Sequence, residues 1–160
     1  MSQLAARGIT PFVPLFVHES LSPAPVARVF AFHESPGALE TLIPPWEEAR
    51  VVLRGSSLQP GTRVVLATRI GPVWVEWEAE HTRYQKDVLF EDVQRRGPFA
   101  RWVHTHRFLP HASGGTTLRD EVDYALPLGP LGALGGGWFV RRKLEKMFAF
   151  RHEATRMACR

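Results

Sequence analysis

Cysteine is almost absent from this chain of 160 residues, in which Cys159, next to the C-terminal residue, is the only one. One cysteine excludes an internal disulfide and a cysteine-based zinc site, which is typical of proteins of the reducing cytosol. A run of about eighteen uncharged apolar residues is also missing, so we expect no transmembrane helix. The first ten residues lack the apolar stretch of a secretory signal. These absences predict a cytoplasmic protein.

Negative charge is scarce at the C-terminal end. Between Arg141 and Arg160, seven lysines and arginines stand against two glutamates, so this segment carries +5 while the whole chain carries +4. A solvated helix face explains this best, and the alternative is contact with an anionic partner. Because no alternation of aromatic and basic residues accompanies the charge, we expect no nucleic-acid partner. A weak contact of this basic segment with an anionic membrane stays open.

No linker or internal repeat divides the chain, and its 44% hydrophobic residues can form a core. We therefore expect a single domain over residues 1–160, with its core at about 12–158. The region Phe12–Glu19 alternates as a strand does, and Pro14 indicates either a sheet edge or a bulge. Prolines then begin two short helices, after Ser22 and after Ser35.

From Trp46 onward the hydrophobic period changes from that of a helix to that of a strand. Six strands are expected, separated by turn residues: Trp46–Arg54, Thr62–Ile70, Val73–Tyr84, Val88–Arg95, Phe99–Leu109 and Thr116–Leu126. Their short connections join antiparallel neighbours in a meander. A loop rich in proline and glycine, Pro127–Gly137, suits a flexible lid better than a phosphate loop. A long helix is expected over Trp138–Cys159.

These elements predict an α+β fold: a seven-stranded, curved antiparallel sheet, with two short helices after strand 1 and a long C-terminal helix. One helix cannot fill the concavity of such a sheet. The space left between the sheet and the C-terminal helix is a small-molecule site by default.

Polar side chains are in phase with aromatic ones in three consecutive strands, because the side-chain period of a strand is 2. The polar members are Asp92, Gln94, His104, His106 and Asp120, and the apolar ones are Phe90, Trp102, Phe108 and Tyr124. A hairpin through Ser113–Gly115 would place Asp120 opposite His104 or His106, depending on the register. One otherwise apolar face therefore carries five polar groups.

Three interpretations of this face remain open. The polar groups can satisfy one another and brace the sheet, anchor the polar end of a ligand, or perform acid–base catalysis with His104 and Asp120. The His104-x-His106 pattern is also typical of metal-binding cupins, but no glutamate follows it at the required spacing, and His111 lies at a turn. We therefore predict neither a metal nor another cofactor.

The order of elements and one block of residues resemble the SRPBCC superfamily (START/Bet v 1-like, helix-grip), which includes polyketide cyclase/dehydrase-like bacterial proteins. The residues that carry the resemblance are Phe90–Gln94, Gly97–Phe99, Trp102, His104, His106, Phe108, Asp120, Tyr124–Pro127, Gly129 and Gly132. It covers the chain from Phe12 to about Arg156 and implies the helix-grip fold. In some relatives a similar domain is joined to a nucleotide-sugar epimerase-like domain.

We predict a domain that binds a hydrophobic small molecule, lipid-, polyketide- or isoprenoid-like, between sheet and C-terminal helix. The predicted apolar contacts are Trp77, Phe90, Trp102, Phe108, Tyr124, Trp138, Met147 and Phe148. Asp92, Gln94, His106 and the pair His104–Asp120 would hold the polar end. One alternative is a cyclase, dehydratase or isomerase that uses His104 and Asp120. Another is an interaction module that docks its basic helix on a membrane or nucleic acid.

Overall fold

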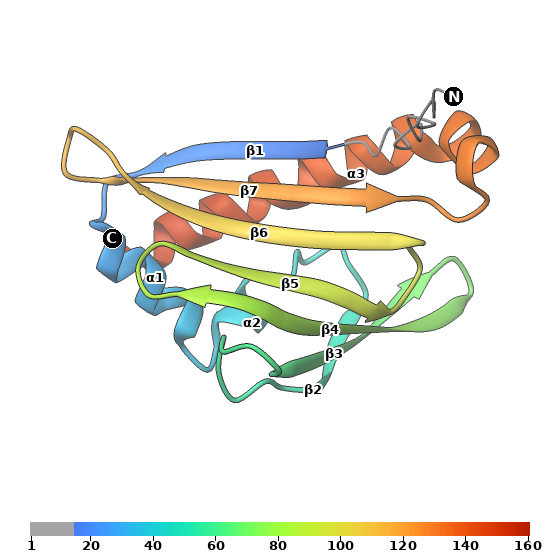
Figure 1. The fold of residues 1–160 in the computed structure, drawn as a ribbon, viewed down its shortest axis with the longest axis horizontal. Coiled ribbons are helices and arrows are strands. Elements are labelled where there is room, and N and C mark those ends of the chain that lie inside the picture. The colour runs from blue at the N-terminus through green and yellow to red at the C-terminus, as the bar shows by residue number, and fades with distance from the viewer. Residues whose placement is uncertain (1–14) are drawn as a thin grey trace, which may run out of the picture.

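The computed structural model of the protein describes residues 15–160, and the elements form a curved sheet with a long helix along one face (Figure 1). In chain order they are β1 (Leu15–Ser22), α1 (Val26–Glu34), α2 (Ala38–Thr41), β2 (Ala49–Leu53), β3 (Arg63–Ile70), β4 (Val73–Gln85), β5 (Leu89–Arg96), β6 (Arg101–Pro110), β7 (Thr116–Ala125) and α3 (Gly129–Ala158). No helix within residues 15–160 has the length and apolar character needed to cross a membrane.

All seven strands are antiparallel and lie in the order β1-β7-β6-β5-β4-β3-β2. Strands β2 to β7 form the predicted meander, and hairpin turns contain Gly71 and Gly114 with the positive φ that glycine tolerates best. The edge strands β1 and β2 are successive in the sequence, so the segment with α1 and α2 crosses the whole sheet. The predicted α+β helix-grip fold is confirmed.

The strand boundaries differ slightly from the expected ones at the start of the sheet. β1 ends at Ser22 rather than Glu19, and residues 12–14 of the expected strand lie outside the described part. β1 is an edge strand, one of the two alternatives that the proline indicated. β2 begins at Ala49, because the chain around Trp46 forms a turn after Pro44.

The prediction of a flexible lid over Pro127–Gly137 is wrong, because α3 begins at Gly129 and contains most of this segment. Leu128 takes a left-handed conformation just before the helix, and a proline occupies the first turn, where a missing N–H costs little. A side chain at Gly132 would collide with the carbonyl oxygen of Pro127. Gly132 therefore permits a close approach at the helix start, where packing outweighs the weak helix propensity of glycine.

Two apolar clusters form the core. One lies near α1 and contains Ala24, Val29, Phe30, Phe90, Phe108, Leu118 and Cys159. The other lies against α3 and contains Phe16, Trp102, Val122, Tyr124, Leu144 and Phe148. Along β6, Trp102 belongs to one cluster and Phe108 to the other, so His104 and His106 lie between them. The inner face of the sheet is therefore apolar at both ends and polar in the middle.

Candidate functional site

A cavity of about 420 Å³ lies between the sheet, the α1–α2 segment, the β2–β3 loop and α3. This volume is within the range of small-molecule sites. Its apolar wall includes Leu39, Leu66, Trp77, Phe90, Trp102 and Met147. Its polar wall consists mainly of His33, His81, Asp92, His104, His106 and Arg151. Its rim is formed by exposed polar residues, Glu34, Ser35, Arg54, Ser56 and Ser57. An apolar chamber with one buried polar end suits an amphipathic small molecule.

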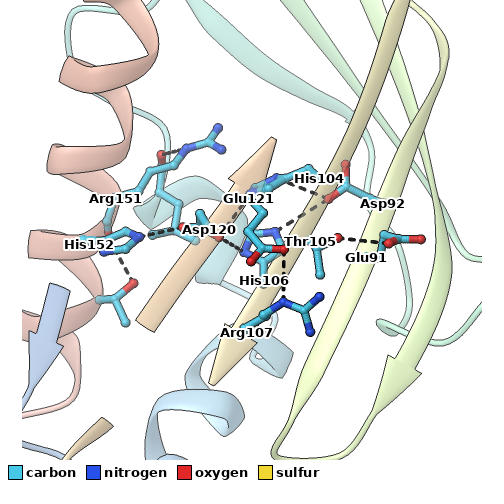
Figure 2. Close-up of polar contacts among 12 residues, drawn as sticks. Glu91, Asp92, His104, Thr105, His106, Arg107, Asp120, Glu121, Arg151 and His152 are labelled. Atoms are coloured by element: carbon cyan, nitrogen blue, oxygen red, sulfur yellow. Dashed lines mark hydrogen bonds and ion pairs between the residues drawn. The ribbon is translucent and has the colours of Figure 1, made fainter. Parts of the chain in front are cut away.

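Asp92, His104 and His106 form the centre of the polar wall, and Asp120 lies directly behind them. We call these four residues, which come from three strands, the inner quartet (Figure 2). The sheet register pairs Asp92 with His104, and His106 with Asp120. Oδ1 of Asp120 lies 3.0 Å from Nε2 of His104 and 2.7 Å from Nδ1 of His106. The contact with His104 is a directed hydrogen bond, whereas that with His106 is an ion-pair contact whose N–H points elsewhere.

The long helix completes the surroundings of Asp120. Nε2 of His152 donates to Oδ2 of Asp120 at 2.6 Å, because an ionised carboxylate can only accept. The other ring nitrogen of His152 lies 2.7 Å from the hydroxyl of Ser20 on β1. Asp120 is only 3% exposed, so it is held by three imidazoles behind the cavity wall. A buried carboxylate requires this many partners to stay charged.

The surroundings of the two imidazoles in the quartet shift their pKa values in opposite directions. Burial alone would lower the pKa of His106, but the carboxylates of Asp120 and Asp92 outweigh it and raise the pKa to about 9. Burial and the charge of His106 lower the pKa of His104. Burial would raise the pKa of Asp120, but the imidazoles hold it well below its ordinary value. At neutral pH, His106 is therefore an imidazolium beside a neutral His104.

Three more basic side chains line the polar end of the cavity. His33 is buried, its Nδ1 lies 2.9 Å from the carbonyl oxygen of Val29, and burial lowers its pKa to about 4. Burial also lowers the pKa of His81. Nε of Arg151 donates to the carbonyl oxygen of Leu42 at 3.2 Å. The buried polar end thus combines neutral imidazoles with the His106 imidazolium and the guanidinium of Arg151.

Seven of the thirteen residues predicted as ligand contacts line the cavity: Trp77, Phe90, Asp92, Trp102, His104, His106 and Met147. The other six lie elsewhere for identifiable reasons. The Gln94 side chain donates to the carbonyl of Phe99 at 2.8 Å and so closes the β5–β6 turn. Asp120 lies behind the histidines.

The remaining four of these residues are apolar. Phe108, Tyr124 and Phe148 fill the two core clusters. Trp138 is 71% exposed, because the extended start of α3 places it on the solvent side.

Four polar residues near the cavity were not predicted as site residues. His81 is in phase with Trp77 along β4, a signal that the sequence did contain. His33 lies four residues after Val29 on the buried face of α1. Arg151 and His152 follow Phe148 at helical spacing on α3. Their approach to the inner quartet depends on how the helices dock on the sheet, which sequence spacing does not determine.

The curved sheet, the long helix and the cavity between them form a helix-grip fold, and the match to a family model places the chain in the SRPBCC superfamily. The chain belongs to the family described as polyketide cyclase / dehydrase and lipid transport, whose model matches residues 22–150. No curated protein matches the sequence.

Solved structures of low identity share this fold. The crystal structure of TTHA0849 from Thermus thermophilus is 20% identical, with a TM-score of 0.71 over 91% of this chain and 97% of that one. Norcoclaurine synthase from Thalictrum flavum is 15% identical, with a TM-score of 0.69 over 98% and 94%. A nucleoside-diphosphate sugar epimerase from Corynebacterium glutamicum is 24% identical, with a TM-score of 0.67 over 89% of this chain but 28% of its own. These likenesses establish the fold alone.

Proposed function

We propose that this protein binds a hydrophobic small molecule, lipid-, polyketide- or isoprenoid-like, with its polar end against the inner quartet. The observation that carries the proposal is the cavity of about 420 Å³, whose inner walls are apolar except at that end, with further polar residues only at its exposed rim. Burial of an apolar ligand surface supplies affinity, at roughly 25 cal/mol per Å². The histidines and Arg151 supply orientation, because unpaired polar groups on a ligand would be costly to bury there.

The cavity wall offers a direct test with a neutral fluorescent probe, N-phenyl-1-naphthylamine. Ala79 lines the cavity, and the variant Ala79→Phe fills part of it. We expect roughly tenfold weaker probe binding, since overpacking costs about 1–3 kcal/mol. The matched control is Ala112→Phe, at an exposed position of the β6–β7 turn. Equal probe affinity in both variants would refute binding in this cavity. Native mass spectrometry with organic extraction then identifies any molecule that co-purifies.

A second candidate function is acid–base catalysis on a bound carbonyl compound, by a cyclase, dehydratase or isomerase. The observation in its favour is the contact between His104 and His106, whose ring centroids are 3.8 Å apart and whose protonation differs at neutral pH. One wall therefore presents a proton acceptor next to a proton donor, as acid–base catalysis requires. His104 and His106 also contact the same carboxylate, that of Asp120, so their protonation is coupled. When one imidazole gains a proton, protonation of the other becomes less favourable.

The catalytic candidate and the carrier candidate differ in one measurement. With a compound extracted from the purified protein, we expect His104→Gln to abolish conversion while the dissociation constant changes little if the protein is an enzyme. A wild-type protein that returns the compound unchanged, or a variant that loses affinity and conversion equally, supports a binding role instead.

A further inference from the structure

Two imidazole nitrogens and one carboxylate oxygen on the cavity wall lie close together, but farther apart than hydrogen-bond partners do. Nδ1 of His104 lies 3.5 Å and Nε2 of His106 lies 3.6 Å from Oδ2 of Asp92, and the three atoms lie within 4.8 Å of one another. Hydrogen bonds of the N–H···O type span about 2.7–3.2 Å. In a tetrahedral site with metal–ligand bonds of about 2.0–2.2 Å, neighbouring ligand atoms are about 3.4 Å apart. We propose that Asp92, His104 and His106 bind a divalent transition-metal ion at this end of the cavity.

The strand geometry explains how three separated residues form one site. His104 and His106 lie two positions apart on β6, so both imidazoles leave the same face of the sheet. Asp92 on the neighbouring strand β5 is in register with His104. The sequence around the His-x-His pattern lacks a downstream carboxylate, and the sheet provides one from an upstream strand instead. Two imidazoles and one carboxylate on adjacent strands form a three-ligand face.

The donors and acceptors of the quartet are incomplete without a cation. A neutral imidazole has a single N–H, so His104 cannot donate to Asp120 and Asp92 together. Its Nε2 donates to Asp120 at 3.0 Å, which leaves the lone pair of Nδ1 facing the carboxylate of Asp92. Two acceptors that face each other repel. A metal ion between the two acceptors would accept a coordinate bond from each and so remove the repulsion.

Asp120 supplies the outer partner that metal-binding histidines usually have. It lies against the nitrogens that point away from the proposed ion, Nε2 of His104 and Nδ1 of His106. A carboxylate that accepts from the other ring nitrogen of a ligand, as Asp120 does from His104, fixes the tautomer and raises the basicity of that ligand. His152 holds Asp120 in place from α3 at 2.6 Å. Asp120 and His152 are therefore positioning residues for this site.

Two neighbouring side chains bear on the affinity and identity of the ion. Nδ1 of His81 is buried in the cavity wall and has no hydrogen-bond partner among residues 15–160, so a further imidazole is available beside Asp92. Arg151 adds a positive charge. Once the ion has displaced the Nε2 proton of the His106 imidazolium, the carboxylates of Asp92 and Asp120 exceed the charge of Arg151 by one. Imidazole ligands select first-row transition metals over Mg²⁺ and Ca²⁺. Because the three ligands line the cavity, the remaining coordination positions face it.

Cobalt provides the test, because Co²⁺ substitutes for Zn²⁺ and absorbs visible light. The purified 160-residue chain is treated with EDTA, dialysed and titrated with Co²⁺, with no organic ligand present. We expect one equivalent to bind with visible absorption bands, to be displaced by Zn²⁺ and to resist Mg²⁺. Asp92→Asn removes a ligand and should abolish the bands, whereas Asp120→Asn should weaken binding by roughly 10–100-fold.

The control is His111→Gln, which removes an exposed histidine of the β6–β7 turn and should leave the titration unchanged. A second measurement needs no variant: Zn²⁺ should raise the melting temperature of the wild-type protein in a concentration-dependent way, because it binds the folded state. Absence of both the cobalt bands and the thermal shift in the wild-type protein would overturn the proposal. Since no organic ligand takes part, that result would leave the proposed binding function standing.

Discussion

Charged residues on the two faces of strands β5, β6 and β7 have different partners, although the residues alternate along the same strands (Figure 2). On the outer face, Glu121 accepts from Arg107 at 3.1 Å and from Arg119 at 2.6 Å. These side chains are between 21% and 35% exposed. On the inner face, the ion-pair partners of Asp120 within residues 15–160 are all imidazoles, and its side chain is nearly inaccessible.

The choice of partner explains what each face can do. A guanidinium stays charged at any physiological pH, so the outer pairs form a fixed and solvent-screened lattice. An imidazole can gain or lose a proton, and burial strengthens its response to neighbouring charges. The inner face therefore combines structural pairing with groups whose protonation depends on their surroundings. Neighbouring residues on one strand thus serve different purposes.

The largest effect is expected from breaking the inner face at Asp120. In Asp120→Ala, His104, His106 and His152 lose their shared acceptor, and a buried imidazolium is left with fewer partners. Removal of one member of a buried charged network costs about 3–5 kcal/mol. We expect the lower part of this range, because His106 can release its proton. Denaturant unfolding of the EDTA-treated protein at pH 7 measures the loss.

The neighbouring position on the outer face is the matched control. Glu121→Ala removes two ion pairs to arginine, but both arginines stay solvated, so the free energy of unfolding should change by less than about 1 kcal/mol. Similar losses for Asp120→Ala and Glu121→Ala would contradict the difference between the faces.

A smaller effect concerns His33, a buried imidazole whose recorded hydrogen bond within residues 15–160 is to the carbonyl oxygen of Val29 rather than to a carboxylate. Its pKa is about 4 in the folded state, against an ordinary 6.5. The unfolded state therefore binds more protons between these values, and stability falls as the pH drops from 6.5 towards 4. We expect this term to reach about 3 kcal/mol at pH 4.

The measurement compares pH profiles of unfolding for the wild type and His33→Leu. His106, Asp120 and His152 are the titratable groups that act on His33, and all three remain in the variant. The variant should therefore lose less stability between pH 7 and pH 4 than the wild type. Parallel profiles would show that His33 does not titrate as its burial implies.

Much of the fold follows from local patterns. Alternation of side chains and turn residues predicted six consecutive strands, and the structure has them within a few residues of the expected bounds. The same period of 2 correctly placed Trp102 and His104 on the inner face. The start of α3 was predicted nine residues too late, because glycine and proline usually interrupt helices. At Gly132, close packing rather than propensity accounts for the residue.

The candidate site was predictable only in part. In-phase positions indicated that Asp92, His104, His106 and Asp120 share a face, but the choice between two registers remained open. The structure pairs His106 with Asp120 in the ladder, while the hydrogen bond to Asp120 comes from His104 on the adjacent position. His152 lies 32 residues beyond Asp120 in sequence, and no local pattern connects them.

The sequence by itself determined which residues form strands, which side of each strand is apolar and which polar groups lie on that side. These properties depend on side-chain period and turn chemistry, which act over a few residues. Only the tertiary structure decided which carboxylate lies against which imidazole, that α1 and α3 add His33 and His152, and where the cavity lies. Those features depend on strand register and helix docking, because contacts between distant segments arise from packing of the whole core.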